Sequence, residues 1–393
     1  MQALNRELHV FGATMLGLGS ILGTGVFVSI GIAAGVAGPA MIVAIGLAAL
    51  LATCNALSSA QLAAAHPVSG GTYEYGYRLL RPELGFSAGW MFLCAKSASA
   101  ATAALGAAGY GLHLAGLAAD GMLRWIGLAI ALGLTLLVLS GLRRSSLINI
   151  VIVSVTILAL TAFGVAGIFR LGSQAAASSF VPFLTEEKGL SGLFYATALM
   201  FVAYAGYGRI ATMGEEVVSP RKTIPRAIIA TLIVSALVYI LVAVAAIGAV
   251  GAAALSGSAG TEATPIETAA RALGVSGLGM LVALGAVTAM LGVLLNLILG
   301  LSRVALAMGR RNDLPTIFAG LTAKGLPRAA ILLVGGIIGA LALIGDVKTV
   351  WSFSALTVLI YYAITNLAAL QLPAAERLYP RWISLAGLAG CLG

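Results

Sequence analysis

The stretch from Phe11 to Ala40, FGATMLGLGSILGTGVFVSIGIAAGVAGPA, contains no charged residue over thirty positions. A run of this length and apolar character predicts a helix that crosses a lipid bilayer. Four glycines nevertheless lie in its middle, at positions 17, 19, 23 and 25. Glycine weakens a helix, and an unpaired backbone group is costly in hydrocarbon. An interruption there needs a reason, and that reason limits both the fold and the function.

The composition identifies the class of protein. Apolar residues make up 60% of the chain and charged residues only 9%, whereas a soluble domain has roughly 25% charged residues. We therefore expect an all-α polytopic membrane protein embedded in the lipid bilayer. The net charge of +9 does not indicate a nucleic-acid partner, because Lys and Arg in so apolar a chain usually set topology. The three cysteines lack metal-ligand spacing, and we expect no cofactor and no metal.

Hydropathy predicts ten complete spans and a truncated eleventh. The ten lie at about 10–38, 40–65, 84–112, 122–141, 146–169, 190–213, 225–251, 274–309, 329–345 and 347–370. The last apolar piece, RWISLAGLAGCLG, begins at residue 381 and is too short to cross. With the N-terminus inside, fifteen Lys and Arg residues fall on the internal side and five on the external side. This bias predicts an integral protein of the plasma (inner) membrane with a cytoplasmic N-terminus.

Three interpretations of the glycine cluster can be compared. Close helix packing is the simplest, because small residues let helices approach in lipid. A nucleotide-binding loop is disfavoured, because no Gly-Lys-Ser/Thr follows. The third is a discontinuous helix whose open backbone forms a ligand site, and such helices come in pairs. Span 6 reads LFYATALMFVAYAGYGRIATMGEEV, with Gly206 and Gly208 at the corresponding depth, which favours this third interpretation.

The pairing of spans 1 and 6 also predicts the domain organisation. Five spans in each half give two repeats of opposite orientation, because five is odd. We expect the first inverted repeat over residues 1–170 and the second over 190–370. Residues 371–393 then form an internal loop and the truncated span.

The open backbone suggests the chemistry of a ligand. The free N–H groups at Gly23, Thr24 and Gly25 begin a half-helix and suit an anion such as a carboxylate. Carbonyl groups left unpaired at Ile21, Val202 and Ala205 suit an ammonium group. An anion site beside a cation site matches the backbone of an α-amino acid.

Three motifs resemble the amino acid–polyamine–organocation superfamily of transporters. They are ILGTGVF at 21–27, HPVSGGTYEYGYR at 66–78 and GYGRIATMGEEVVSPRKTIPRAI at 206–228, the last closest to the cationic amino acid transporter branch. SRVALAMGRRNDLP at 302–315 also fits the end of span 8. The resemblance implies an amino acid permease with a five-plus-five inverted-repeat fold and alternating access. It implies that residues 23–25 hold the substrate carboxylate and that Gly206 belongs to the binding segment. It also implies that an aromatic residue near Val202, either Phe201 or Tyr204, closes over the substrate.

Two departures from the cationic branch bear on the substrate. That branch commonly has an acidic residue after the span 6 break, whereas this chain reads Gly206-Tyr207-Gly208 and then Arg209. Lys96 falls by motif spacing near the part of span 3 that lines the side-chain pocket in relatives. Because positive charges repel Lys and Arg substrates, we expect neutral or acidic amino acids.

Lys96, Arg209 and Glu215 are the candidates for coupling and gating. Lys96 is an ionisable residue deep in a span, so it is a candidate to bind and release a proton, or else it pairs with a carbonyl or snorkels. Arg209 could bind an anionic group or donate to carbonyls of the unwound segment. Glu215 is expected in a structural or gating ion pair at the cytoplasmic end of span 6.

The coupling ion stays open. Sodium is less favoured, because only Thr288 offers a hydroxyl in the middle of span 8, and symport with H⁺ or exchange without an ion are both compatible with the chain. The alternatives are a transporter of another small organic solute and a non-transporting amino acid sensor. We do not expect an enzyme, because no metal, aspartyl or serine–histidine motif is present. The loop HLAGLAADGM contains no cysteine, so no disulfide-linked heavy subunit is expected.

Overall fold

The fold is seen in a computed structural model that describes residues 9–66, 70–118, 121–141, 146–172, 174–184, 189–211, 217–322 and 325–393. The first half of the chain contains α1 (Val10–Ile21), η1 (Gly25–Ser29), α2 (Ile30–Ala37), η2 (Gly38–Ala40), α3 (Met41–Ala65), α4 (Thr72–Leu79), α5 (Pro82–Leu114), α6 (Leu123–Leu139), α7 (Ser146–Arg170) and α8 (Gln174–Ser178). The second half contains α9 (Gly189–Tyr204), η3 (Ala205–Tyr207), α10 (Gly208–Ala211), α11 (Pro220–Thr261), α12 (Pro265–Ala272), α13 (Leu278–Arg310), η4 (Thr316–Ala319), α14 (Arg328–Ile344), α15 (Val347–Leu370) and α16 (Arg381–Leu392).

The all-helical prediction is confirmed for the part of the chain that the structure describes. Each expected span coincides with a helix or with a pair of helices to within a few residues, except that α11 begins at Pro220 and runs on to Thr261. A kink at Gly251, where φ is 75°, divides this long helix. The short helices α4, α8 and α12 were not predicted, because each lies in a connection too short or too polar to register as a span.

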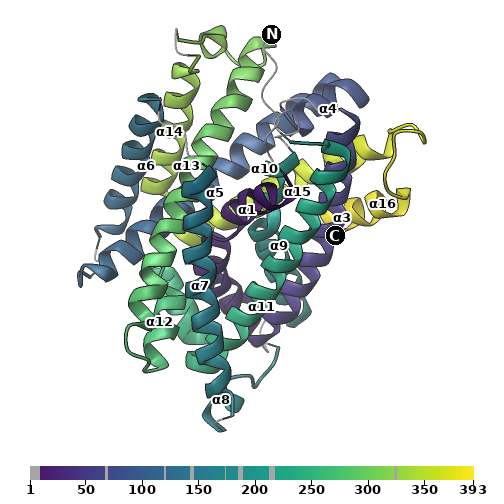
Figure 1. The fold of residues 1–393 in the computed structure, drawn as a ribbon. Helices are drawn as coiled ribbons and strands as arrows, with labels where there is room; N and C mark the ends of the chain where they lie inside the picture. Colours follow the sequence, from purple (N-terminus) through teal and green to yellow (C-terminus); the bar gives the residue numbers. More distant parts are fainter. Residues whose placement is uncertain are drawn as a thin grey trace.

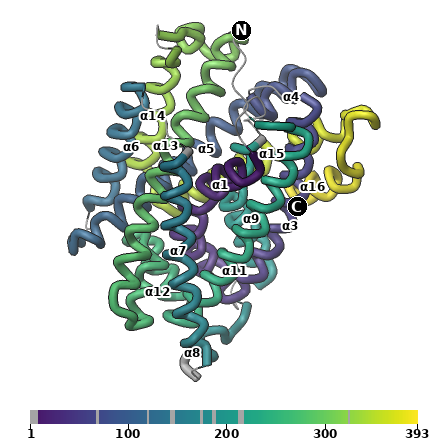
Figure 2. The backbone as a smooth tube through the Cα atoms, in the orientation of Figure 1, coloured from purple at the N-terminus to yellow at the C-terminus, as the bar shows by residue number. Residues whose placement is uncertain are grey.

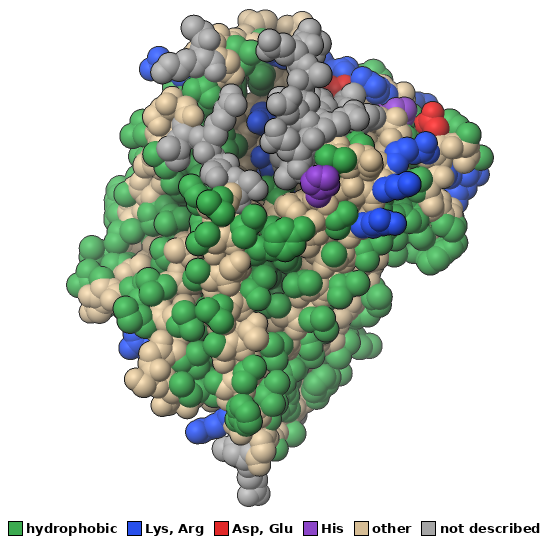
Figure 3. Space-filling view, viewed as in Figure 1, with side chains coloured by type: hydrophobic (Ala, Val, Ile, Leu, Met, Phe, Trp, Pro, Cys, Tyr) green, Lys and Arg blue, Asp and Glu red, His purple; other side chains and the backbone are tan. Residues whose placement is uncertain are grey.

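Within the described ranges, seven helical stretches are long and apolar enough to cross a membrane, and α1, α6, α14 and α16 are shorter apolar helices. Figure 3 shows the consequence on one face, where hydrophobic side chains cover a broad central band and Lys and Arg gather mainly at the upper end. The chain is an integral membrane protein.

The two interrupted spans lie inside the bundle rather than at its edge. Figures 1 and 2 show α1 at the centre, with α7, α9 and α11 around it, while α6 and α14 lie together at one side. The long helix α5 packs against α13 and α15, and α1 contacts both η3 and α10. Spans 1 and 6 are therefore neighbours, although about 180 residues separate them in the sequence.

The glycines of the opening stretch have two different roles. A Cβ at Gly17 would lie 2.6 Å from the Cδ1 of Ile210, and one at Gly19 would lie 2.5 Å from Oδ1 of Asn149. These two positions serve close helix packing. Between α1 and η1 the backbone leaves the helical path at Leu22, where ψ is 86°. Here, around Gly23, the helix is interrupted, so the packing and discontinuity interpretations each hold for part of the cluster.

A second close approach joins the two interruptions. A Cβ at Gly206 would lie 2.3 Å from the backbone oxygen of Ser20, far inside a normal contact. A Cβ at Gly25 would lie 2.7 Å from the Cβ of Ala203. Any larger residue at either glycine would push the two interrupted spans apart.

A polar latch holds the α4 end of the bundle closed. The hydroxyls of Tyr73 and Tyr77 on α4 both donate to Oδ2 of Asp313, just after α13, at 2.6 Å. Arg311 donates to Glu74 at 2.6 Å and lies 4.4 Å from the ring centroid of Tyr77. Burial and the bond to Asp313 raise the pKa of Tyr77 to about 12, so its hydroxyl remains a donor at neutral pH.

A second cluster of charges joins α12 to α5 at the opposite end of the bundle (Figure 1). Glu267 on α12 is 1% exposed and contacts both His113, near the end of α5, and Arg271, one turn further along α12. Gly109 on α5 lets the end of α11 approach, because a Cβ there would collide with the backbone oxygen of Glu262. The helix α12 is thereby fastened over the end of α5.

The crossing of the interrupted spans gives a stability prediction. We expect Gly206→Ala to lower the melting temperature of the detergent-solubilised protein by several degrees, because overpacking costs about 1–3 kcal/mol. Gly336→Ala is the matched control, since a Cβ there meets nothing within 4 Å. That control should be neutral or slightly stabilising, because Ala favours a helix over Gly. Equal melting temperatures for Gly206→Ala and the wild type, measured by thermal unfolding, would contradict the close crossing.

A candidate ligand site at the interrupted helices

The two interruptions meet in the interior and bring most of the predicted ligand groups together. Ile21, Val202 and Ala205 are each no more than 4% exposed. Gly25 faces Ala203 across the crossing, and Gly206 faces Ser20. The backbone segments predicted to hold a carboxylate and an ammonium group thus lie side by side in a buried region.

Thr24 is the most informative residue of the first interruption. Its side chain is 4% exposed, and its Oγ1 has no hydrogen-bond partner in the described part of the chain. A buried hydroxyl without a partner costs about 1–3 kcal/mol, so such a group requires an explanation. The hydroxyl belongs to the residue between Gly23 and Gly25, where it could donate to an anion. The Gly23 N–H, which the sequence predicted to be free, instead donates to the Ile21 carbonyl at 3.0 Å, because the chain turns sharply where α1 ends.

Tyr239 on α11 joins the two interruptions and was missed by the sequence analysis. Its hydroxyl donates to the carbonyl of Ile21 at 2.8 Å and lies 3.3 Å from that of Ala203. A Cβ at Gly25 would lie 2.6 Å from this hydroxyl. Tyr239 therefore satisfies one of the carbonyls that the first interruption leaves open. Nothing in the local sequence of α11 signals this contact, which depends on the tertiary arrangement.

The carbonyl of Ala205 receives two donors. The Nζ of Lys96 donates to it at 3.3 Å, and the hydroxyl of Tyr362 on α15 donates to it at 3.3 Å. Lys96 itself is 7% exposed. Its helix is held in place by Ser354, whose Oγ donates to the carbonyl of Ala95 at 2.8 Å and lies 2.8 Å from the Oγ of Ser99. Lys96 thus reaches the second interruption, as its spacing suggested.

The aromatic residues predicted to cover a ligand lie at two different places. The ring of Phe201 packs edge-on against Tyr362, with centroids 5.5 Å apart, and the ring of Tyr204 lies 5.0 Å from that of Tyr239. Both are fully buried. Phe201 is therefore near the Ala205 carbonyl, whereas Tyr204 is near Tyr239, the residue that bonds the Ile21 carbonyl.

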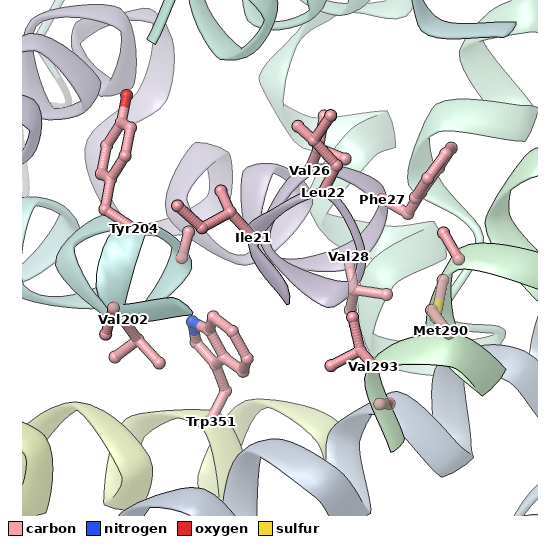
Figure 4. Packing of buried hydrophobic residues seen from close by; sticks show 14 of the residues in the cluster. Ile21, Leu22, Val26, Phe27, Val28, Val202, Tyr204, Met290, Val293 and Trp351 are labelled. Atoms are coloured by element: carbon pink, nitrogen blue, oxygen red, sulfur yellow. The ribbon is translucent and has the colours of Figure 1, made fainter. Parts of the chain in front are cut away.

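Trp351 on α15 also lies beside the interrupted helices, and the sequence analysis did not identify it. Figure 4 shows its indole between Val202 and Val293, pointing toward Ile21. Its Nε1 donates to the carbonyl of Leu199 at 3.1 Å. An indole that is 2% exposed and anchored by its polar edge leaves an apolar ring face beside Val202.

Two other predicted residues are placed differently. Arg209 on α10 lies against α13, since a Cβ at Gly300 would be 3.8 Å from its guanidinium. Glu215 lies outside the residues that the structure describes. Its proposed gating role is therefore a prediction from the sequence alone.

The arrangement places a free donor, the Thr24 hydroxyl, near the carbonyls of Ile21 and Ala205, which accept from groups of the protein itself. A small zwitterion could bind here if its amino group replaced one of those donors. A group of His, Cys, Asp or Glu side chains suited to a metal ion is absent from the described residues. A cavity of about 340 Å³ opens elsewhere, at the α12 end. Its lining includes His113, Glu262 and Arg271, about 25 Å along α5 from Lys96, so it is separate from the interruptions.

Known proteins with similar sequences or folds support a transporter. An uncharacterized transporter of Mycobacterium tuberculosis is 40% identical over 390 residues, which are 99% of this chain and 85% of the relative. The branched-chain amino acid permease BcaP of Bacillus subtilis is 29% identical, over 80% of this chain and 69% of the relative. Human cationic amino acid transporter 4 is 28% identical, over 92% of this chain and 58% of the relative.

The fold is similar to that of MhsT, whose crystal structure in complex with L-phenylalanine superposes with a TM-score of 0.73 at 16% identity. The match covers 100% of this chain and 98% of MhsT. A model of the amino acid permease family matches residues 12–393. The interrupted helices therefore belong to a membrane transporter, not an enzyme, and the chain is a member of the amino acid permease family.

Proposed function

We propose that this protein binds a neutral or acidic amino acid between its interrupted helices and moves it across the membrane by alternating access. The substrate carboxylate lies at Thr24 and the Gly25 backbone, and its ammonium lies at the carbonyls of Ile21, Val202 and Ala205. The unpartnered, buried Thr24 hydroxyl carries this proposal, because a carboxylate is the ligand that would satisfy it. Phe201 and Tyr204 provide the aromatic cover, and Gly206 keeps the two segments close.

The preference for neutral or acidic side chains rests on charge. Arg209 follows the second interruption, and Lys96 reaches the Ala205 carbonyl, so a cationic side chain would meet the positive charge of Arg209, and that of Lys96 wherever the lysine keeps its proton. The relatives named above include both a branched-chain and a cationic amino acid transporter. The apolar faces of Val202 and Trp351 fit the branched-chain type better.

Alternating access requires that each end of the bundle can open. The contacts that join the helices at the two ends include hydrogen bonds and ion pairs, with Tyr73, Tyr77 and Asp313 at one end and His113 and Glu267 at the other. Such contacts can be exchanged for water at modest cost. In the proposed topology the α4 end faces the cytoplasm of a plasma (inner) membrane protein with a cytoplasmic N-terminus. The two halves, 1–170 and 190–370, are inverted repeats, and 371–393 form an internal loop and a partial span.

Transport is tested most simply by uptake of a labelled amino acid panel into proteoliposomes. We expect neutral or acidic amino acids to be taken up at least about tenfold faster than arginine or lysine, because charge repulsion of about 1.4 kcal/mol gives that ratio. We also expect uptake to depend on an imposed proton gradient in the wild type but not in Lys96→Met. Strong uptake of arginine would contradict the charge argument, and no uptake of any amino acid would contradict the proposed function.

The carboxylate site is tested by Thr24→Val, which keeps the side-chain shape and removes the hydroxyl. We expect the dissociation constant of the transported amino acid to rise about tenfold or more, because a hydrogen bond to a charged group contributes about 1.5–3 kcal/mol. The melting temperature should not fall, since the lost hydroxyl has no partner without a ligand. Thr24→Ser is the control and should bind like the wild type. Unchanged binding by Thr24→Val would remove Thr24 from the site.

A further inference from the structure

Lys96 occupies one of the backbone carbonyls that we assign to the substrate. Its Nζ donates to the Ala205 carbonyl, which is one of the acceptors assigned to the substrate's amino group. The hydroxyl of Tyr362 donates to the same oxygen. A carbonyl oxygen has two lone pairs, so these two donors leave it no free position for a third. The substrate's ammonium can reach this oxygen only if one donor moves away, and a second ammonium beside that of Lys96 would be repelled by its like charge.

The second predicted acceptor is occupied in a similar way, but by a neutral group. The Ile21 carbonyl accepts from the hydroxyl of Tyr239 and from the N–H of Gly23. A hydroxyl can rotate and accept from an incoming ammonium, whereas a lysine ammonium can only donate. The conflict with a substrate amino group is thus specific to Lys96.

Among the described residues, no carboxylate forms an ion pair with Lys96. None of the ion pairs found in the described ranges includes it. The titratable groups nearby are phenols, Tyr362 from α15 and Tyr207 from η3, whose rings lie 5.5 Å apart. The charged residue that follows the second interruption in the sequence, Arg209, is positive and lies against α13 at Gly300. An uncompensated buried ammonium is costly, and an anionic ligand or loss of the proton would relieve that cost.

We propose that the Lys96 ammonium is an internal substitute for the substrate's amino group. It holds the Ala205 carbonyl until an amino acid binds, and the amino acid displaces it with release of one proton to solvent. A carboxylate without an amino group, such as the 2-oxo acid with the same side chain, binds with Lys96 in place, and its oxo oxygen accepts from the ammonium. The inference rests on the proposed function and adds 2-oxo acids as a second ligand class for the same site.

The affinities for amino acids and for 2-oxo acids should change with pH in opposite directions. Amino acid binding and protonation of Lys96 exclude each other, so amino acid affinity rises as pH rises through the titration of Lys96. The 2-oxo acid requires the protonated lysine, so its affinity falls over the same range. A purely structural Lys96 would produce neither trend.

The test is isothermal titration calorimetry on the purified full chain in lipid nanodiscs. L-leucine and 4-methyl-2-oxopentanoate form one matched pair, and L-glutamate and 2-oxoglutarate form the other. Each titration is run in two buffers of different ionisation enthalpy, which gives the number of protons released. We expect close to one proton per amino acid for the wild type and none per 2-oxo acid. This measurement needs no variant.

Lys96→Met removes the ammonium and keeps an apolar chain of similar length. At about pH 6 we expect Lys96→Met to bind the amino acid about tenfold or more tightly than the wild type, and to release no proton. We expect it to bind the 2-oxo acid about tenfold more weakly than the wild type. Lys348→Met, at an exposed position outside the site, is the matched control and should behave as the wild type. If Lys96→Met does not fold, Lys96→Gln provides a neutral donor that should likewise release no proton.

The outcomes separate the inference from the proposed function. Amino acid binding without proton release, and unchanged by Lys96→Met, would overturn the role of Lys96 and leave the amino acid site intact. Failure of the wild type and of both Lys96 variants to bind either amino acid would overturn the proposed function itself. Proton release on binding both ligands of a pair would also overturn the inference, because the 2-oxo acid has no amino group to displace the lysine.

Discussion

A backbone group inside a membrane must have a hydrogen-bond partner, and this constraint organises the centre of the molecule. Two neighbouring helices are interrupted, and the carbonyls of Ile21, Ala203 and Ala205 at these interruptions need donors. The protein satisfies them with side chains from other spans, namely Tyr239 from α11, Lys96 from α5 and Tyr362 from α15. These long helices are thereby tied to the interruptions. The same groups that complete the backbone hydrogen bonding are the groups that a substrate would have to displace.

Much of the fold could be predicted from the chain because membrane spans follow from length and apolar character alone. The interruption of span 1 was also visible, since Gly23 and Gly25 stand where a regular helix would exclude them. The separate role of Gly17 and Gly19 was not visible, because it depends on Ile210 and Asn149, which come from distant spans. Local sequence reports that a position is small but does not report which neighbour requires it to be small.

The backbone groups that meet at the interruptions could be predicted from the sequence, whereas the side chains that contact them could not. Thr24, Ile21 and Ala205 follow from the interruptions themselves, so reasoning about free N–H and carbonyl groups could find them. Tyr239 and Trp351 lie in long apolar helices, where an aromatic residue is as common on a packed face as in a site. Only the packing of α11 and α15 against the interruptions distinguishes them. The adjacent Tyr361 and Tyr362, in an otherwise apolar span, were the one signal that the sequence offered.

The motif at 66–78 and the motif at 302–315 contact each other through Tyr73, Tyr77 and Asp313, so they form one latch at the α4 end.

The account of the site itself is tested most directly by a cryo-electron microscopy structure of the full chain with a bound amino acid. It predicts the carboxylate at the Thr24 hydroxyl, the amino group on the Ala205 carbonyl, and Lys96 withdrawn from that oxygen. An amino acid found instead in the cavity beside His113 and Arg271, with Lys96 still on Ala205, would contradict it.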